Sequence, residues 1–341
     1  MCWTWRSAAW ASWKQRVWSN KFMKLVVQIP CYNEASTLAR TIEEIPRRVP
    51  GIDKVLVLVI DDGSEDRTPE IAEQAGADRV VRLPRKMGLA AAFVTGLENA
   101  LQMGADIIVN TDGDNQYPGR EIPRLIDPVL TGRADLAVAE RGLAELPGYS
   151  RFKLLLQRLG SWFVGLLAGT EIRDAPSGFR AMSRETALKL NVYGRYTYTI
   201  ETLIEAGRGK MRLVWVPVSV NPQPGRQSRL YANIGQYLAR SVEAMVRTYS
   251  RYEPLRVFLT IGGLVFASGF GIGAWFLYYF FAAGGKGHVQ ILILAAVLMI
   301  IGFQVLLIGL VADLISGNRK LLEELIQRMR KLDHQDSGRN S

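Results

Sequence analysis

Two long runs near the carboxyl end of the sequence contain no Asp, Glu, Lys or Arg. They cover residues 257–285 and 287–312, and Lys286 is the single charged residue between them. A helix needs about 20 apolar residues to cross about 30 Å of hydrocarbon, so each run is long enough. The sequence therefore predicts two transmembrane helices within residues 255–315, joined by a short loop.

Basic residues gather at the two outer ends of this predicted hairpin. Arg247, Arg251 and Arg256 precede it, and Arg319, Lys320, Arg328, Arg330 and Lys331 follow it. By the positive-inside rule, both ends and the large domain before the hairpin are predicted to be cytoplasmic, in an inner or plasma membrane. We also expect an amphipathic juxtamembrane helix over residues 230–254 and a basic tail over residues 316–341. Small residues in the spans would allow close helix association and are compatible with a homo-oligomer: Gly262, Gly263, Gly269 and Gly273.

The residues before the hairpin alternate between strand and helix patterns. Apolar runs predict strands at residues 25–29, 55–60, 79–83, 107–109, 135–139 and 213–220, with helices that include residues 36–48, 88–103 and 197–208. This alternation predicts an α/β domain over residues 23–229, with a Rossmann-like, mostly parallel sheet and helices on both faces. Pro217 in the last strand predicts a sheet edge, because proline cannot donate a ladder hydrogen bond.

Acidic side chains follow three of the predicted strands. Glu34, the pair Asp61 and Asp62, and the pair Asp112 and Asp114 each come after an apolar run. In open α/β sheets, ligands bind beyond the carboxyl ends of the strands. We therefore expect these carboxylates to face one binding site.

The sequence Asp112-Gly113-Asp114 has the spacing of a metal site. Alternate residues at a strand end can place two carboxylates on one side of the backbone, and Gly113 adds no bulk between them. With the amide oxygen of Gln116 they offer hard oxygen ligands for Mg²⁺ or Mn²⁺, whose other positions are often filled by substrate phosphates. The alternative is an ordinary polar turn, for which the same residues are well suited.

Composition and motif absences exclude several functions. The net charge of +10 suits anionic lipid or phosphorylated substrates. Zinc-finger spacing and basic runs interleaved with aromatics are missing from the domain before the hairpin, so nucleic acid is not a predicted partner. The two cysteines, Cys2 and Cys31, indicate a reducing compartment. The two histidines, His288 and His334, lie outside the α/β domain, which argues against a histidine-based triad.

Three segments each allow two interpretations. Residues 1–22 are rich in tryptophan and basic residues, and form either an interfacial segment or a disordered extension. Residues 151–169 form either a helix on the membrane surface or an ordinary core helix. The basic loop at residues 221–229 either closes over a diphosphate and excludes water, or is simply solvated.

Three motifs in combination resemble a known enzyme family. They are Pro30-Cys31-Tyr32-Asn33-Glu34, Asp61-Asp62-Gly63-Ser64 and Asp112-Gly113-Asp114-Asn115-Gln116. The combination resembles the inverting family-two glycosyltransferases of GT-A fold. More narrowly, it is similar to the polyprenyl- and dolichyl-phosphate hexosyltransferases of the dolichol-phosphate mannose synthase type. The similarity covers about residues 24–230, and the two-span tail resembles that of bacterial membrane-anchored members.

The resemblance implies a role for each matching residue. Pro30, Tyr32 and Glu34 would line the nucleotide-sugar pocket, where Asp61 or Asp62 would hold the base or ribose. Asp112 would face the donor, while Asp114 and Gln116 would bind Mg²⁺ or Mn²⁺. Arg141 and Arg151 would face the acceptor phosphate, and Arg226, Ser228 and Arg229 would approach the diphosphate. The implied catalytic residues are Asp112, Asp114 and Arg141.

The implied reaction moves a hexose from a UDP- or GDP-linked sugar to a polyprenyl phosphate at the membrane surface. A lipid phosphate is largely dianionic at pH 7, because its second pKa is about 6, so it can attack without a general base. Such an acceptor suits a domain that lacks histidine. One alternative is transfer to a hydroxyl of a lipid or glycan, which would need a base such as Glu201 or Glu205. The other is a non-catalytic membrane scaffold.

Overall fold

The computed structural model describes residues 22–142, 151–190, 192, 198–221, 254–282 and 289–337. The chain divides into two compact units, Met1–Ala244 and Met245–Ser341. All of the predicted extension except Phe22, and all of the predicted juxtamembrane helix except Pro254, lie outside the described residues.

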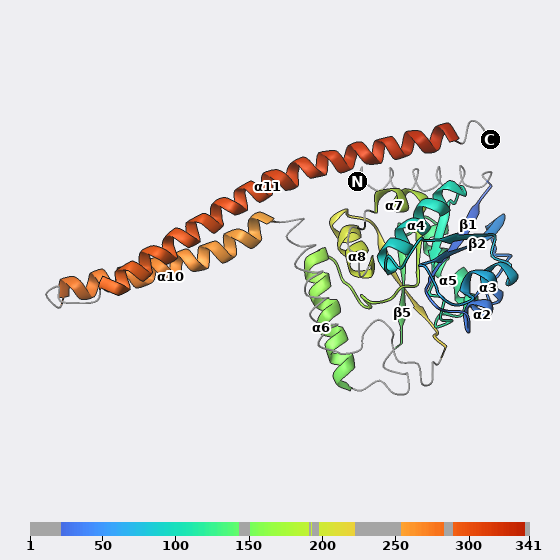
Figure 1. Ribbon diagram of the computed structural model, residues 1–341, viewed down its shortest axis with the longest axis horizontal. Coiled ribbons are helices and arrows are strands. Elements are labelled where there is room, and N and C mark those ends of the chain that lie inside the picture. Colours follow the sequence, from blue (N-terminus) through green and yellow to red (C-terminus); the bar gives the residue numbers. More distant parts are fainter. Residues whose placement is uncertain are drawn as a thin grey trace, which may run out of the picture. The chain divides into compact units, whose positions relative to one another are not determined.

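The first unit is built on one seven-stranded sheet (Figure 1). Its strands are β1 (Lys24–Cys31), β2 (Lys54–Asp61), β3 (Arg79–Arg82), β4 (Ile107–Asn110), β5 (Leu136–Arg141), β6 (Arg180–Ser183) and β7 (Leu213–Val218). Their order across the sheet is β3-β2-β1-β4-β6-β5-β7. β6 is antiparallel to its neighbours β4 and β5, and the other pairs are parallel. The predicted mostly parallel α/β sheet is therefore confirmed.

Helices cover both faces of the sheet, because its central strands are apolar on both sides. Residues 25–27 of β1 are completely buried. One face packs in a single core with α2 (Leu38–Glu43) and α5 (Ile122–Leu130). The other face contacts α4 (Leu89–Gln102), whose Gly96 lies against Gln28 and Ile60. The other helical elements described in this unit are α3 (Thr68–Gln74), η1 (Gly119–Glu121), α6 (Arg151–Ala168), α7 (Arg184–Lys189) and α8 (Tyr198–Arg208).

The strands at the far side of the sheet show one confirmed and one missed prediction. β7 is the last strand in the order, so Pro217 lies on an edge as predicted. The strands predicted from the sequence do not include β6, which begins at Arg180 and runs between β4 and β5. β6 has four residues and starts with an arginine, so it offers neither the length nor the apolar pattern that predicts a strand.

The second unit is a hairpin of two apolar helices, α10 (Pro254–Ala282) and α11 (Val289–Ser337). By length and composition, Pro254–Ala282 and Val289–Asn318 could each span a membrane, as predicted. Gly262 lies where the two helices meet, since a Cβ there would be 2.9 Å from the carbonyl oxygen of Gly302. Gly269 approaches the carbonyl oxygen of Ala295 in the same way, at 2.8 Å. These two glycines pack the hairpin itself, and a homo-oligomer stays a prediction.

Candidate functional site

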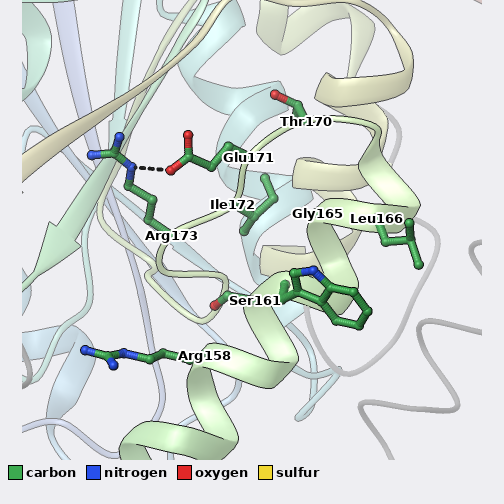
Figure 2. Close-up of a pocket in the computed structure, with 9 residues that line it drawn as sticks. Arg158, Ser161, Gly165, Leu166, Thr170, Glu171, Ile172 and Arg173 are labelled. Atoms are coloured by element: carbon green, nitrogen blue, oxygen red, sulfur yellow. Dashed lines mark hydrogen bonds and ion pairs between the residues drawn. The ribbon is translucent and has the colours of Figure 1, made fainter.

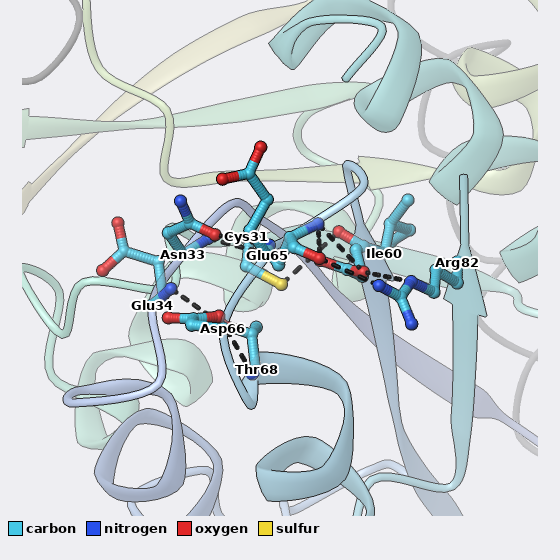
Figure 3. Close-up of polar contacts among 10 residues, drawn as sticks. Cys31, Asn33, Glu34, Ile60, Glu65, Asp66, Thr68 and Arg82 are labelled. Carbon is cyan, nitrogen blue, oxygen red and sulfur yellow. Dashed lines mark hydrogen bonds and ion pairs between the residues drawn. The ribbon is translucent and has the colours of Figure 1, made fainter. Parts of the chain in front are cut away.

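The loops after β1 and β2 are fastened to each other by hydrogen bonds between side chains and backbone (Figure 3). The Asn33 N–H donates to Ser64 Oγ at 2.8 Å, and the Glu34 N–H donates to Thr68 Oγ1 at 2.9 Å. In the opposite direction, the Glu65 N–H donates to Asn33 Oδ1 at 2.9 Å. Asn33 has a φ of 54°, a left-handed conformation that asparagine tolerates. These bonds fix the backbone that carries Glu34 at the carboxyl edge of the sheet.

The two carboxylates after β2 are both engaged by the protein. Asp61 is completely buried, accepts the Ser64 N–H at 3.0 Å and pairs with Arg82 Nε at 3.4 Å. Asp62 accepts the N–H groups of residues 87 and 88 at 2.7 and 2.9 Å. Both side chains therefore hold the loops that surround the site. Contact of either one with a base or ribose stays a prediction.

A basic and an aromatic side chain meet at the same edge. Lys86 Nζ lies 3.8 Å from the centroid of the Tyr32 ring, a cation–π contact that joins the loop before α4 to the loop after β1. Pro30 is paired with Ile60 of β2, one residue before the end of β1. Tyr32, which is predicted to line the nucleotide pocket, thus lies beside a positive charge, which suits an anionic nucleotide.

Asp112 and Asp114 lie two and four residues after the end of β4, and the glycine between them is closely packed. A Cβ at Gly113 would lie 3.1 Å from Cys31 Cβ and 3.6 Å from Glu34 Cγ. The β4 loop therefore lies against the end of β1. Two of the three predicted acidic clusters, Glu34 and the Asp112 pair, are brought together.

The turn after Asp114 also receives the segment that follows β7. Asp114 Oδ1 accepts the Gln116 N–H at 3.0 Å, and Asn115 has a left-handed φ of 57°. The Asn221 N–H donates to Gln116 O at 2.9 Å, and Asn221 Nδ2 donates to Asn115 O at 3.0 Å. The predicted basic loop therefore begins at this turn. Its residues Arg226, Ser228 and Arg229 lie outside the described residues.

The electrostatics of the β4 loop favour a cation. Burial, and then the charge of Asp114, raises the pKa of Asp112 to about 7. A divalent cation between the carboxylates would offset their repulsion. Among the described residues, no group of three or more His, Cys, Asp or Glu side chains could hold a metal ion. The site thus fits Mg²⁺ or Mn²⁺ only if substrate oxygens complete its coordination, as is common for Mg²⁺.

Arg141 ends β5 and is held by a buried carboxylate. Its Nε donates to Asp174 Oδ2 and its Nη2 to Asp174 Oδ1, both at 2.8 Å. β5 runs in the same direction as β4, because both are antiparallel to β6, so Arg141 ends its strand at the same edge of the sheet as the β4 loop. Its positive charge lowers the pKa of Asp112, against the effect of burial. Arg151, the other residue predicted to face the acceptor, is the first residue of α6, and its side chain is not among those described.

A buried polar network lies against Asp112 and was missed by the sequence analysis. Asn110 Nδ2 donates to Gly178 O and to Tyr198 Oη, both at 2.8 Å. A Cβ at Gly178 would lie 2.8 Å from Tyr198 Oη and 2.9 Å from Asp112 Oδ1. The Asp112 carboxylate therefore packs directly against the backbone at Gly178.

Arg180 holds the segment that contains Gly178 in place. It is completely buried, and its Nε donates to Ser177 O at 2.9 Å. Its Nη1 donates to Thr202 Oγ1 on α8, and its Nη2 to Ala175 O at 3.3 Å. Burial lowers its pKa to about 10, so the guanidinium remains charged at neutral pH. Its charge, like that of Arg141, opposes the raised pKa of Asp112.

The outer face of α6 is apolar. Leu159, Trp162, Phe163 and Leu166 follow helical spacing and are 52%, 64%, 40% and 62% exposed. The opposite face is packed, and Arg208 Nε from α8 donates to Leu167 O at 2.7 Å. A pocket lies beside the exposed face, and in Figure 2 its Arg158 and Arg173 extend to the side opposite Leu166. α6 is therefore more exposed than the core-helix interpretation predicts.

The two alternative general bases lie on α8. Glu201 is 6% exposed and Glu205 is half-buried. Burial leaves Glu201 little access to a substrate.

Comparison with known proteins identifies the family. The sequence profile described as glycosyl transferase family 2 matches residues 26–190. The polyprenol monophosphomannose synthase of Mycolicibacterium smegmatis is 30% identical over 207 residues, which cover 58% of this chain and 77% of that protein. The chain belongs to glycosyl transferase family 2. This glycosyltransferase is an enzyme, which excludes the alternative of a non-catalytic scaffold.

Further similarities cover the hairpin and the fold of this glycosyltransferase. The undecaprenyl-phosphate mannosyltransferase of Micrococcus luteus is 27% identical over 222 residues, covering 62% of this chain and 89% of that protein. A profile described as GtrB C-terminal hairpin matches residues 253–317 and, with the two apolar helices, indicates membrane association. A crystal structure of glucosyl-3-phosphoglycerate synthase from Mycobacterium tuberculosis with Mn²⁺, UDP-glucose and phosphoglyceric acid has a TM-score of 0.53 at 24% identity, covering 67% of this chain and 79% of that chain. That likeness supports the predicted GT-A fold.

Proposed function

We propose that this glycosyltransferase moves a hexose, with inversion, from a UDP- or GDP-linked sugar to a polyprenyl phosphate at the cytoplasmic membrane surface. The observation that carries the proposal is the meeting of an acidic pair, Asp112 and Asp114, with the charge of Arg141 at one edge of the sheet. The relatives named undecaprenyl-phosphate mannosyltransferase and polyprenol monophosphomannose synthase support the same class of acceptor.

On the donor side, the chain's residues would bind the nucleotide and the diphosphate. Pro30 of β1, and Tyr32 and Glu34 in the loop after it, would border the nucleotide, and Lys86 adds a positive charge beside Tyr32. Mg²⁺ or Mn²⁺, held by Asp114 and Gln116, would neutralise charge on the leaving diphosphate. The proposed contacts of Arg226, Ser228 and Arg229 with the diphosphate, and of Arg151 with the acceptor, rest on the sequence alone.

On the acceptor side, a phosphate dianion attacks without a general base, because it is already ionised at neutral pH. The absence of histidine from the α/β domain agrees with such an acceptor, since the two histidines are His288 and His334. A dianion does require a cation to hold it near the anomeric carbon. Arg141 would supply that charge, since its guanidinium pairs with Asp174 and its positive charge acts on Asp112 of the β4 loop.

Membrane attachment brings the enzyme and a lipid acceptor into one plane. The apolar face of α6 would rest on the lipid surface, which is one of the two interpretations of residues 151–169 given by the sequence. At the far end of α10, Trp275, Tyr278 and Tyr279 are exposed, as expected where a span meets an interface. The basic residues at the other ends of both spans favour a cytoplasmic catalytic unit.

The first experiment is transfer of radiolabelled sugar to a short-chain polyprenyl phosphate by the purified full-length enzyme. A panel of UDP- and GDP-sugars is supplied with Mg²⁺ or Mn²⁺. Label that enters the lipid with one donor supports the proposal and identifies the sugar. Absence of transfer with every donor, in protein that still binds nucleotide, would instead favour a hydroxyl acceptor.

Removal of apolar bulk from α6 tests the proposed membrane contact. The double substitution Trp162→Ser and Leu166→Ser should lower transfer to a long-chain acceptor in vesicles by at least about fivefold, because two exposed side chains no longer enter the lipid surface. Transfer to a short-chain acceptor in detergent should be unchanged. Gln102→Ser, an exposed substitution at the end of α4 outside the proposed membrane contact, is the control. Equal losses in vesicles and in detergent would contradict a membrane role.

A further inference from the structure

Asp174 is a buried carboxylate whose hydrogen-bonding capacity is used entirely by the protein. Its Oδ2 accepts the Arg141 N–H at 3.1 Å and Arg141 Nε at 2.8 Å. Its Oδ1 accepts Arg141 Nη2 at 2.8 Å and Gln157 Nε2 at 2.9 Å. An ionised carboxylate has about four acceptor sites, so these four bonds satisfy it. Asp174 therefore acts on its protein neighbours and not on a substrate or a metal.

The geometry restricts Arg141 more than a simple ion pair would. The side chain of Asp174 is 3% exposed and that of Arg141 is 10% exposed, so water screens their attraction little. Two parallel bonds to Nε and Nη2 fix the plane of the guanidinium, and the bond from the Arg141 backbone N–H fixes the carboxylate against the end of β5. The direction in which the positive charge of Arg141 points is thus set by Asp174.

The same carboxylate is connected to α6. Gln157, which donates to Asp174, lies on α6, and Ser161 one turn later accepts the N–H of Ala175 at 3.2 Å. The helix whose outer face is apolar therefore holds the residue that orients Arg141. A short run of contacts links the proposed lipid-facing surface to the proposed acceptor site.

We propose that Asp174 is a positioning residue, which aims Arg141 at the acceptor phosphate and is itself held by Gln157 of α6. This inference rests on the proposed function. Asp174 contributes no proton and no ligand to the reaction. Its contribution is a guanidinium that is oriented before the phosphate arrives, which lowers the ordering cost of binding.

The test is the kinetics of full-length Asp174→Asn in detergent with a short-chain polyprenyl phosphate. An asparagine would turn an NH₂ group toward the N–H donors of Arg141, so the pair of parallel hydrogen bonds from Nε and Nη2 would be lost. The KM for the acceptor should rise at least about tenfold, while the KM for the nucleotide sugar changes by less than about twofold. An unchanged acceptor KM, or an equal rise in both KM values, would overturn the inference.

A double-substitution cycle with Arg141→Gln separates positioning from general stability. If Asp174 acts through Arg141, adding Asp174→Asn to Arg141→Gln should change the acceptor KM by less than about twofold. If the two substitutions instead raise the acceptor KM independently, so that their fold-changes multiply in the double variant, Asp174 has a merely structural role and the inference is overturned.

If Asp174→Asn does not fold, Gln157→Leu serves in the same cycle, with a smaller rise in acceptor KM expected only when Arg141 is present. No rise would overturn the inference. Absence of transfer to polyprenyl phosphate by the unsubstituted enzyme would instead overturn the proposed function, and the inference with it.

Discussion

Asp114→Ala is expected to lower sugar transfer to polyprenyl phosphate by about 10³-fold, because charge on the leaving diphosphate would lose its stabilisation. Asp114 lies four residues beyond the end of β4, and its Oδ1 accepts the Gln116 N–H at 3.0 Å. Loss of the carboxylate also removes the charge that helps to raise the pKa of Asp112. The measurement is single-turnover transfer of radiolabelled sugar at saturating Mg²⁺ or Mn²⁺.

The matched control for this substitution is Asp127→Ala. Asp127 is an exposed residue of α5 whose side chain pairs with Arg133, and exposed ion pairs contribute little to stability. This variant should transfer sugar at the original rate. Metal-dependent nucleotide binding should weaken in Asp114→Ala and persist in the control, with both proteins inserted in the membrane. Full transfer by Asp114→Ala would remove Asp114 from the proposed metal site.

The parts of the fold that were predictable are those fixed by local apolar pattern. Residues 25–27 are buried on both faces of a strand, so every position in that run must be apolar. The two spans are likewise defined by the length of their uncharged runs. Acidic clusters at strand ends could be placed at one edge because parallel strands end on the same side, and Glu34 does lie beside Gly113.

The parts that were not predictable depend on contacts between distant residues. Arg180 is separated from its partner Thr202 by 22 positions, and Arg141 from Asp174 by 33, so no local spacing reveals either contact. In the sequence, a fully buried arginine such as Arg180 cannot be distinguished from an arginine on the surface. Asp61 and Asp62, predicted to contact the base or ribose, also accept backbone N–H groups that the sequence does not reveal, from Ser64 in the same loop and from Met87 in the loop before α4.

Gly178→Ala is expected to reduce transfer by about 10²-fold while the protein stays folded, because small displacements of a reacting group are costly. The added Cβ would lie 2.8 Å from Tyr198 Oη and 2.9 Å from Asp112 Oδ1, closer than side-chain atoms pack. Tyr198 cannot yield easily, because its ring stacks on Phe93 with centroids 4.0 Å apart and its hydroxyl accepts from Asn110. The Asp112 carboxylate must therefore move away from its place beside Asp114.

Gly160→Ala on α6 is the matched control, since a Cβ at Gly160 would meet nothing within 4 Å. It should keep full transfer and gain slightly in thermal stability, because alanine favours a helix by about 1 kcal/mol over glycine. The transfer rates and melting temperatures of both variants distinguish a loss of transfer from a loss of folding. Unimpaired transfer by Gly178→Ala would show that the position of Asp112 tolerates displacement. A loss that parallels unfolding would assign the effect to the buried network of Asn110 and Tyr198, and not to Asp112.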